Sequence, residues 1–368
     1  MFTTHYKDFF RDWYFSFQNT SIFCKMLGTQ ESSSWHKEAN VGVHTDMVVD
    51  SYCSSISGAW GKKDFLGAIY CAFHDTGKPK AEEVTTSDDG VSRKKYSGHE
   101  IFSARLFVDY VYSDTRLLCL LDERDIYNIA VMIQSHIPYS FRTEKMRQLK
   151  THLCAFGLDQ VFTRCLMADT RGRISDDQEN KIVAAENWIR DIFNPTEPMT
   201  LVDERVPLVT LMCAPTGAGK TTVVNKIAAS YKELGKKVGV HSLDWCRLNW
   251  YSKDYEEAFR LATADSQFDN KAMRDFGDKA KANDVVIVDN TNTSPKRRKR
   301  YIVVNTHAVV FLLDYQTNYA RCRDRQDKTI GQHVLDSMYW NFKLPILGEV
   351  DKIFIISRME GIGICMTA

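Results

Sequence analysis

The sequence lacks any apolar run long enough to cross a membrane. No stretch approaches the ~20 consecutive apolar residues that a membrane-spanning helix needs. The opening residues, MFTTHYKDFFRDWYF, mix aromatic and charged side chains, unlike the apolar centre of a signal peptide. We therefore expect a cytoplasmic protein that has no membrane among its partners.

An excess of charge and closely spaced cysteine pairs are also missing. The net charge of +1 gives no overall sign of nucleic-acid binding, so any basic surface must be local, and SPKRRKR at 294–300 is one candidate. The 10 cysteines form no CxxC pair, which favours reduced thiols over a disulfide framework. With 368 residues, 44% hydrophobic and 26% charged, the chain is globular and long enough for two domains.

Two patterns divide the chain. Apolar residues recur at helical spacing around 65–75, 99–112, 124–136 and 185–193. Short apolar runs typical of buried parallel strands then alternate with helical stretches, at 208–214, 236–242, 284–289, 308–314 and 352–357. Prolines gather between the two patterns. The sequence predicts an all-α domain at 1–195, a linker at 196–206 and an α/β domain with a parallel sheet at 207–368.

APTGAGKT, residues 214–221, matches the phosphate-binding loop pattern, with alanine in the first glycine position. It follows a predicted strand and opens a predicted helix, where backbone amides and the helix N-terminus attract phosphate. We expect ATP or another nucleoside triphosphate with Mg²⁺ as cofactor, Lys220 on the β and γ phosphates and Thr221 on the metal ion. The expected cofactor-binding residues are Gly217, Ala218, Gly219, Lys220, Thr221 and Thr222.

HSLDWCR, residues 241–247, places Asp244 three residues before Arg247 and directly after the second predicted strand. Ligands of open parallel sheets bind at the carboxyl ends of strands, so Asp244 should face the nucleotide crevice. There a carboxylate can accept the proton of an attacking alcohol, and Arg247 can hold a phosphate of that acceptor. The alternative is an aspartate that caps the helix, with a surface arginine.

Two further motifs suit phosphoryl transfer. VIVDNTN, residues 286–292, ends a buried strand with Asp289 and Thr291, where polar groups would meet Mg²⁺-bound water or the acceptor. RCRDR places Arg321 and Arg325 at helical i and i+4 positions, and two guanidinium groups on one face would stabilise a transferring phosphoryl group. A solvated basic helix face is the alternative for this pair.

The motifs APTGAGKTT, SLDWCR, VDNTNTSPKRR and HVLDSMYWNFKLP resemble the kinase domain of bacteriophage-type 5′-hydroxyl polynucleotide kinases, in order over most of 205–345. The resemblance implies that Asp244 is the general base and that Lys220, Arg321 and Arg325 act on the donor. It also implies an acceptor site formed by Arg247, Asp289, Thr291 and Asn292.

A series of histidines and aspartates in the helical half has the residue types of a metal site. His-Asp at 74–75 closes an apolar helix, and the full series is His44, His74, Asp75, His99, His136 and Asp169. Nitrogen and oxygen ligands together favour Mn²⁺, Fe²⁺, Ni²⁺ or Zn²⁺, and a carboxylate can bridge two such ions about 4 Å apart. Lys78 would lie close enough to steady a phosphoryl oxygen. Each histidine alone is more often an ordinary core residue.

This series resembles the HD phosphohydrolase superfamily. WHKEANVGVHTDMV and MADTRGR are similar to the HD domain attached to some bacterial tRNA nucleotidyltransferases, over roughly 35–175. The resemblance implies one or two metal ions, with His44, His74, Asp75 and Asp169 as the more specific ligands and His99 and His136 completing a second site.

Together the two halves resemble bifunctional bacterial and phage enzymes that heal RNA ends. The resemblance implies a substrate of RNA, with DNA as the other candidate, that carries 5′-hydroxyl and 2′,3′-cyclic phosphate ends in a bacterial or phage-infected cytosol. A separate RNA ligase is the implied partner. The alternatives are a nucleoside kinase fused to an HD nucleotidase for salvage, and a kinase with a non-catalytic, RNA-binding HD module.

Overall fold

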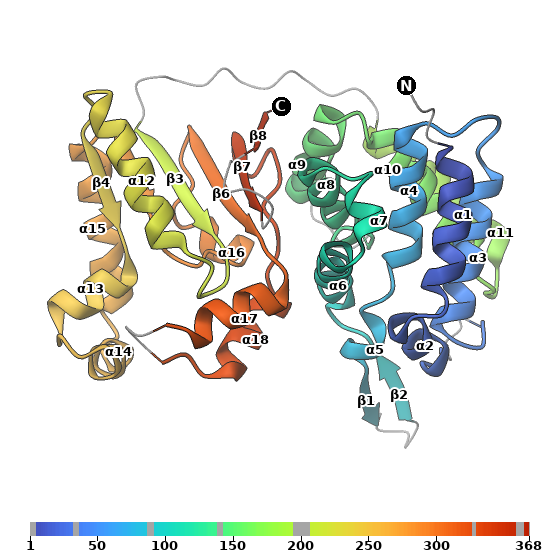
Figure 1. Cartoon of the computed structure of the whole chain (residues 1–368), viewed down its shortest axis with the longest axis horizontal. Coiled ribbons are helices and arrows are strands. Elements are labelled where there is room, and N and C mark those ends of the chain that lie inside the picture. The colour runs from blue at the N-terminus through green and yellow to red at the C-terminus, as the bar shows by residue number, and fades with distance from the viewer. Residues whose placement is uncertain are drawn as a thin grey trace. The chain divides into compact units, whose positions relative to one another are not determined.

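The computed structural model describes residues 5–31, 37–86, 92–137, 143–193, 207–325, 329–357 and 364–367. The chain forms two compact units, Met1–Glu197 and Pro198–Ala368. The first is helical and the second is built on a largely parallel sheet, which confirms the predicted fold class (Figure 1). The predicted linker at 196–206 lies outside the described residues. No helix in the described ranges is long and apolar enough to cross a membrane.

The first unit is a bundle of helices with one small hairpin. Its helices are α1 (Tyr6–Phe17), α2 (Ser21–Gly28), α3 (Val41–Ser54), α4 (Lys62–Phe73), α5 (Lys78–Ala81), α6 (His99–Ser113), α7 (Thr115–Leu118), α8 (Glu123–Ile133), α9 (Thr143–Ala155), α10 (Asp159–Arg171) and α11 (Gln178–Phe193). The hairpin pairs β1 (Glu83–Thr86) with β2 (Ser92–Lys95) in antiparallel register. The sequence pattern did not predict this hairpin.

Helix α4 runs through the middle of the first unit. All residues from Phe65 to Phe73 are buried, and a helix that is apolar all round must be covered on every side. Helices α1, α3, α8 and α10 pack against it. The helix ends at Phe73, and His74 forms its C-cap through a backbone hydrogen bond to Tyr70. The residues that follow α4 are therefore held inside the bundle.

The second unit is a sheet covered by helices. Its strands are β3 (Leu208–Cys213), β4 (Val238–His241), β5 (Val285–Val288), β6 (Thr306–Leu312), β7 (Lys352–Ser357) and β8 (Ile364–Thr367). Its helices are α12 (Lys220–Glu233), α13 (Leu243–Trp250), α14 (Tyr255–Ala264), α15 (Phe268–Ala282), α16 (Pro295–Arg298), α17 (Tyr315–Arg323) and α18 (Gln332–Trp340). The strand order is β4-β5-β3-β6-β7-β8, and β8 alone is antiparallel to its neighbour.

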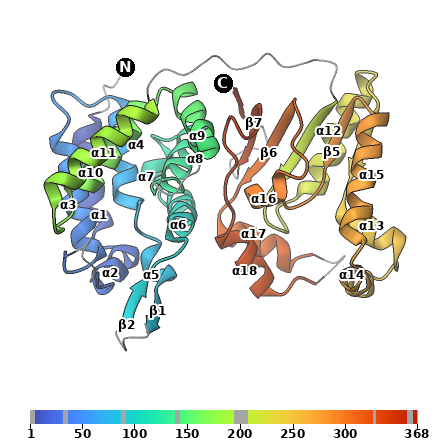
Figure 2. The same ribbon diagram turned by 180° about the vertical axis from the view of Figure 1, so that it is seen from behind.

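The five parallel strands are those that the apolar runs predict. Every residue of β5 is buried, because α12 lies over one face of the sheet and α15 over the other (Figures 1 and 2). Strands covered on both faces carry continuous apolar runs. The carboxyl ends of β3, β4 and β5 meet at one edge of the sheet, and the polar residues that follow these strands gather there.

Arg298, within the basic run 294–300, belongs to the core of the second unit. It is fully buried, and its Nε and Nη2 atoms lie 2.7 and 2.9 Å from the carboxylate oxygens of Glu349. Its Nη1 atom donates to the carbonyl oxygens of Lys343 and Asn292 at 2.8 and 3.1 Å. This side chain ties α16 to the loop after β5 and to the segment before β7.

Replacing Arg298 with alanine should lower the free energy of unfolding of the second unit by about 3–5 kcal/mol, because Glu349 would be left as an uncompensated buried charge. The matched control is Arg300→Ala, whose ion pair with Asp269 has side chains that are 34% and 67% exposed and should contribute about 0–1 kcal/mol. Chemical denaturation measures the free energy of unfolding of both variants. The unfolding transition of the second unit is recognised because added nucleotide shifts it to higher denaturant concentration. Equal losses for the two variants would contradict the assigned role of Arg298.

Candidate functional site

A cleft of about 1770 Å³ opens at the carboxyl ends of β3, β4 and β5. Sites for single drug-sized ligands usually measure about 300–1,000 Å³, so this cleft has room for a nucleotide and a second molecule. All six residues predicted to bind the cofactor, from Gly217 to Thr222, line it.

The phosphate loop connects β3 to α12 with an unusual backbone. Gly217 and Gly219 have φ angles of 76° and 90°, a region that favours glycine. A Cβ atom on Gly217 would lie 2.2 Å from the sulfur of Cys322. Helix α17 also binds the loop from outside, because Asn318 Nδ2 donates to the carbonyl of Thr216 at 2.7 Å and Arg321 Nη1 to that of Ala218 at 3.0 Å. These contacts fix the loop in a form suited to binding phosphate through its amides.

Thr221 and Asp289 together offer oxygen ligands beside the loop. The Thr221 hydroxyl donates to Asp289 Oδ2 at 2.9 Å, and the Lys220 ammonium donates to the Pro215 carbonyl at 2.7 Å. Hydroxyl and carboxylate oxygens are ligands that Mg²⁺ prefers, so this pair fits the expected metal. Asp289 was predicted to bind the acceptor, and the structure places its carboxylate in contact with Thr221, the residue predicted to bind Mg²⁺.

Asp244 lies in the first turn of α13 and lines the same cleft as Lys220. Its Oδ1 atom accepts hydrogen bonds from Arg247 Nη1 at 2.8 Å and from the Tyr255 hydroxyl at 3.2 Å, and its side chain is 39% exposed. Ser242 caps the helix by accepting from the Trp245 amide. The alternative that Asp244 is itself the cap is therefore wrong.

Arg247 is not a surface arginine. Its side chain is only 18% exposed, and its guanidinium lies 4.9 Å from the ring centroid of Phe259 and 5.3 Å from that of Phe268. Cation–π contacts and the ion pair with Asp244 hold it at the wall of the cleft. No sequence motif indicated Tyr255 or Phe259, because both residues lie on α14, beyond the SLDWCR segment.

Some polar residues of the loop after β5 hold the backbone in place, and all of those from Asp289 to Asn292 line the cleft. Asn292 is buried, has a φ of 45°, and donates its amide to the Met212 carbonyl at 2.9 Å. Its side chain therefore anchors the loop to β3, and the residue also lines the cleft in which the acceptor site is predicted. The Thr291 hydroxyl accepts from Arg297 at 3.3 Å. Asn290 accepts from the Leu243 amide at 2.9 Å and so positions the start of α13.

Arg321 and Arg325 both line the cleft but do not share a helix face. Helix α17 ends at Arg323 with Asp324 as its C-cap, so Arg325 lies beyond it. The prediction of an i, i+4 pair is wrong on this point. Only Asn318 and Cys322 of α17 are buried, so the helix lacks the apolar stripe that would hold another turn against the core.

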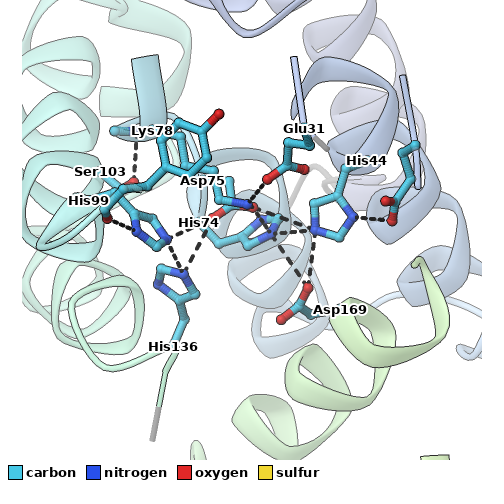
Figure 3. Close-up of polar contacts among 12 residues, drawn as sticks. Glu31, His44, His74, Asp75, Lys78, His99, Ser103, His136 and Asp169 are labelled. Carbon is cyan, nitrogen blue, oxygen red and sulfur yellow. Dashed lines mark hydrogen bonds and ion pairs between the residues drawn. The ribbon is translucent and has the colours of Figure 1, made fainter. Parts of the chain in front are cut away.

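The predicted metal ligands of the first unit converge on one centre. His44 comes from α3, His74 and Asp75 from the end of α4, His99 from α6, His136 from the turn after α8, and Asp169 from α10. Figure 3 shows the imidazole rings and carboxylates facing one another from these separate elements. All six side chains are buried.

Asp75 lies between two groups of ligands. Its Oδ2 atom is 3.5 and 3.2 Å from Nε2 of His44 and His74, and its Oδ1 atom is 3.1 and 3.4 Å from Nε2 of His99 and His136. Asp169 Oδ1 joins the first group, 3.1 Å from His44 and 3.9 Å from His74. These distances allow one metal position on each side of the Asp75 carboxylate, with Asp75 as the bridge.

Backbone carbonyls set the orientation of all four imidazoles. The Nδ1 atoms of His74, His99 and His136 lie 2.8, 2.7 and 2.8 Å from the carbonyl oxygens of Cys71, Tyr96 and Ile133. That of His44 lies 3.2 Å from the Gly172 carbonyl. When Nδ1–H donates to a carbonyl, the Nε2 lone pair is left for a metal, which is how metal-binding histidines are usually held.

The charges around the centre suit a divalent cation. Burial opposes ionisation of Asp75, but His74 and Lys78 outweigh it and hold the pKa of Asp75 well below its usual range. Burial lowers the pKa of His136, which keeps that ring neutral. Burial also lowers the pKa of His44, but hydrogen bonds to Asp169 and Glu38 raise it to about 9, so a metal ion would displace a proton there. The nitrogen and oxygen donors fit Mn²⁺, Fe²⁺, Ni²⁺ or Zn²⁺.

The predicted Lys78 and three further charged residues, Glu31, Glu38 and Arg173, surround the ligands. The buried Lys78 ammonium contacts Asp75 at 2.8 Å and also Glu31, so two of its three donors already have acceptors. Glu38 lies 3.3 Å from His44 Nδ1. Arg173 contacts both oxygens of Asp169. The contact between Glu31 and Lys78 could not be predicted from their spacing in the sequence, because only the tertiary fold brings these two segments together.

Parts of the chain resemble known proteins. Residues 209–345, less than half of the chain, match a family described as "AAA domain". Over 96 residues the chain is 32% identical to "Signal recognition particle receptor FtsY" of Neisseria meningitidis serogroup C, covering 25% of this chain and 23% of that protein. Over 94 residues it is 35% identical to "Flagellar biosynthesis protein FlhF" of Aquifex aeolicus, covering 24% of each.

The chain thus spans about a quarter of the length of these curated relatives. A solved structure of FtsY from Mycoplasma mycoides shares 12% identity over 69% of this chain and 92% of that chain, with a TM-score of 0.21. The family match and the geometry of the phosphate loop identify the second unit as a P-loop nucleotide-binding domain of the NTPase and kinase type.

Replacing Gly217 with alanine should weaken nucleotide binding at least tenfold, because the added methyl group would meet Cys322 and the positive φ would be strained. Gly235→Ala is the matched control, since it has a φ of 74° and no atom within 4 Å of the added methyl. Equilibrium titration with a fluorescent ATP analogue compares the two. If the two variants bound the ATP analogue with equal affinity, the close contact between Gly217 and Cys322 of α17 would not determine the shape of the phosphate loop.

Elemental analysis of the full-length protein after gel filtration should find two transition-metal ions in the first unit, one for each ligand group. His99→Ala should retain about one, because it removes a ligand from one group only. His152→Gln is the control, since His152 is buried and bonded to Asn128, away from the cluster. Unchanged metal content in His99→Ala would contradict the two-ion arrangement.

Proposed function

We propose that this protein heals broken RNA ends: the second unit phosphorylates 5′-hydroxyl ends, and the first removes 2′,3′-cyclic phosphate and the remaining 2′- or 3′-phosphate. The observation that carries the kinase proposal is the Asp244 carboxylate in the same cleft as the phosphate loop. A carboxylate bound to Arg247 and Tyr255 rather than to the phosphate loop suits an incoming alcohol, which needs a proton acceptor.

In the proposed transfer, the acceptor 5′-oxygen forms a bond to the γ-phosphorus of ATP as the bond between that phosphorus and the bridging oxygen of ADP breaks. Asp244 accepts the hydroxyl proton late in this step. The contacts of Asp244 with Arg247 and Tyr255 support this role, because they hold the carboxylate in one orientation in the cleft. Positioning of this kind supplies much of the rate in phosphoryl transfer.

The remaining cleft residues divide between donor and acceptor. Lys220 and the loop amides bind the β and γ phosphates, and Thr221 with Asp289 holds Mg²⁺. Arg247 binds the phosphate that follows the acceptor nucleoside. Arg321 and Arg325, which line the cleft from α17 and the residues after it, neutralise charge on the transferring group. Hydrogen bonding of Arg321 to the loop carbonyl of Ala218 supports its place beside the donor phosphates.

In the first unit, His44, His74, Asp75 and Asp169 would hold one metal ion and Asp75, His99 and His136 a second. Such ions polarise phosphoryl oxygens and make bound water more acidic. Arg173 orients Asp169, and Lys78 holds the Asp75 carboxylate between the two ligand groups, where it would serve both ions. The third ammonium donor of Lys78 is then the one suited to a phosphoryl oxygen of the substrate.

The two activities would produce the 3′-hydroxyl and 5′-phosphate ends that a separate ligase joins. RNA is the proposed substrate, because cyclisation of the phosphate needs a 2′-hydroxyl that DNA lacks. ATP or another nucleoside triphosphate is the donor.

Asp244→Asn should lower 5′-phosphorylation of a labelled 5′-hydroxyl oligoribonucleotide by about 10²–10⁴-fold, since it removes the proton acceptor. Asp254→Asn is the control, because Asp254 lines the same cleft but caps α14 through the Glu257 amide. Hydrolysis of a 2′,3′-cyclic nucleotide should be unchanged in both variants. His74→Ala should show the reverse pattern, with hydrolysis lost and phosphorylation kept.

Loss of both activities in either variant would contradict independent sites. Phosphorylation of mononucleosides but not of oligonucleotides would instead support nucleoside salvage. Full phosphorylation by Asp244→Asn would remove Asp244 from the chemistry.

A further inference from the structure

Two large aromatic side chains that follow Asp244 in the sequence lie exposed in the cleft. Trp245 on α13 is 50% exposed and Phe259 on α14 is 47% exposed, and both line the cleft that contains Asp244 and Lys220. Exposed rings that gather in a polar cleft indicate a ligand with flat apolar faces.

A cation lies against each ring. The Lys279 ammonium is 4.8 Å from the ring centroid of Trp245 and is itself held by Asp275 at 2.6 Å. The Arg247 guanidinium is 4.9 Å from the ring centroid of Phe259. These contacts fix the orientation of both rings while leaving about half of each side chain open to solvent. Nucleobases can stack on exposed aromatic rings whose orientation is fixed in this way.

The cleft also carries an excess of basic side chains. Seven basic and four acidic residues line it, with Lys253, Arg297 and Arg300 among the basic ones that lie outside the phosphate loop. A positively charged groove with exposed aromatic rings is typical of sites that bind single-stranded nucleic acid, where the cations contact phosphates and the rings stack on unpaired bases.

We propose that Trp245 and Phe259 stack on the bases of the nucleotides that follow the 5′-terminal nucleotide of a single-stranded polynucleotide acceptor. The inference rests on the proposed kinase activity of the same cleft and adds a preference for chain length. It follows from the continuity of the two rings with Asp244 and from the size of the cleft, which exceeds the room that one nucleotide needs.

The test compares two acceptors with the full-length protein, ATP and Mg²⁺. One is a nucleoside 3′-monophosphate, which can reach Arg247 but has no following base, and the other is a single-stranded 5′-hydroxyl oligoribonucleotide. The wild type should have a KM at least tenfold lower for the oligonucleotide. Trp245→Ala should raise that KM about tenfold and leave kcat and the mononucleotide KM unchanged, because stacking affects binding of the longer acceptor alone.

Two variants separate stacking from folding. Trp245→Phe keeps an aromatic face and should restore most of the lost affinity. Trp250→Ala changes another exposed tryptophan of α13 that does not line the cleft, and it should keep the wild-type preference for the oligonucleotide.

The proposal is overturned if the wild type has the same KM for both acceptors, or if Trp245→Ala raises both KM values equally. If both acceptors were phosphorylated with the same KM, the proposed kinase activity would stand and only the proposed stacking on Trp245 and Phe259 would be wrong. If the wild type phosphorylates neither acceptor, the proposed kinase function itself fails and the stacking surface fails with it.

Discussion

The buried carboxylate of Asp75 is the constraint on which the helical unit depends. Removing a charge from water is costly unless opposite charge and hydrogen-bond donors surround it. Asp75 lies within 3.5 Å of Nε2 atoms from four histidines and 2.8 Å from Lys78. Those histidines come from α3, α4, α6 and the end of α8, so the helices can pack only in ways that bring these side chains to one point. The contacts between each Nδ1 atom and a backbone carbonyl leave every Nε2 atom facing the centre. A divalent cation bound there would accept the Nε2 lone pairs.

The P-loop unit uses a related arrangement at the edge of its sheet. Asp289 and Asp244 follow neighbouring strands, and hydrogen-bonded neighbours hold each carboxylate in the cleft. Thr221 pairs with Asp289 on the side proposed for Mg²⁺, and Arg247 and Tyr255 bind Asp244 on the side proposed for the acceptor. Two carboxylates can therefore lie in a cleft that also binds phosphate. The aromatic side chains next to Asp244 extend the same surface, which connects the proposed chemistry to the proposed choice of a polynucleotide strand.

Patterns within short segments predicted much of this structure. Continuous apolar runs predicted the five parallel strands, because strands covered on both faces need them, and the His-Asp pair after an apolar helix predicted a buried centre. Sequence reasoning failed where distant segments decide the outcome. Arg325 has helical spacing from Arg321, but α17 lacks the buried stripe needed to extend that far. Glu31 and Tyr255 reach Lys78 and Asp244 only through tertiary packing.

The decisive substrate is a broken RNA stem that carries a 2′,3′-cyclic phosphate on one side of the break and a 5′-hydroxyl on the other. The full-length, metal-loaded protein is given this substrate with Mg²⁺, with and without ATP, and each end is scored separately. We expect a 3′-hydroxyl in both reactions and a 5′-phosphate only in the reaction with ATP. A 5′-hydroxyl that persists while ATP is consumed, or a cyclic phosphate that persists with metal bound, would contradict the proposed function.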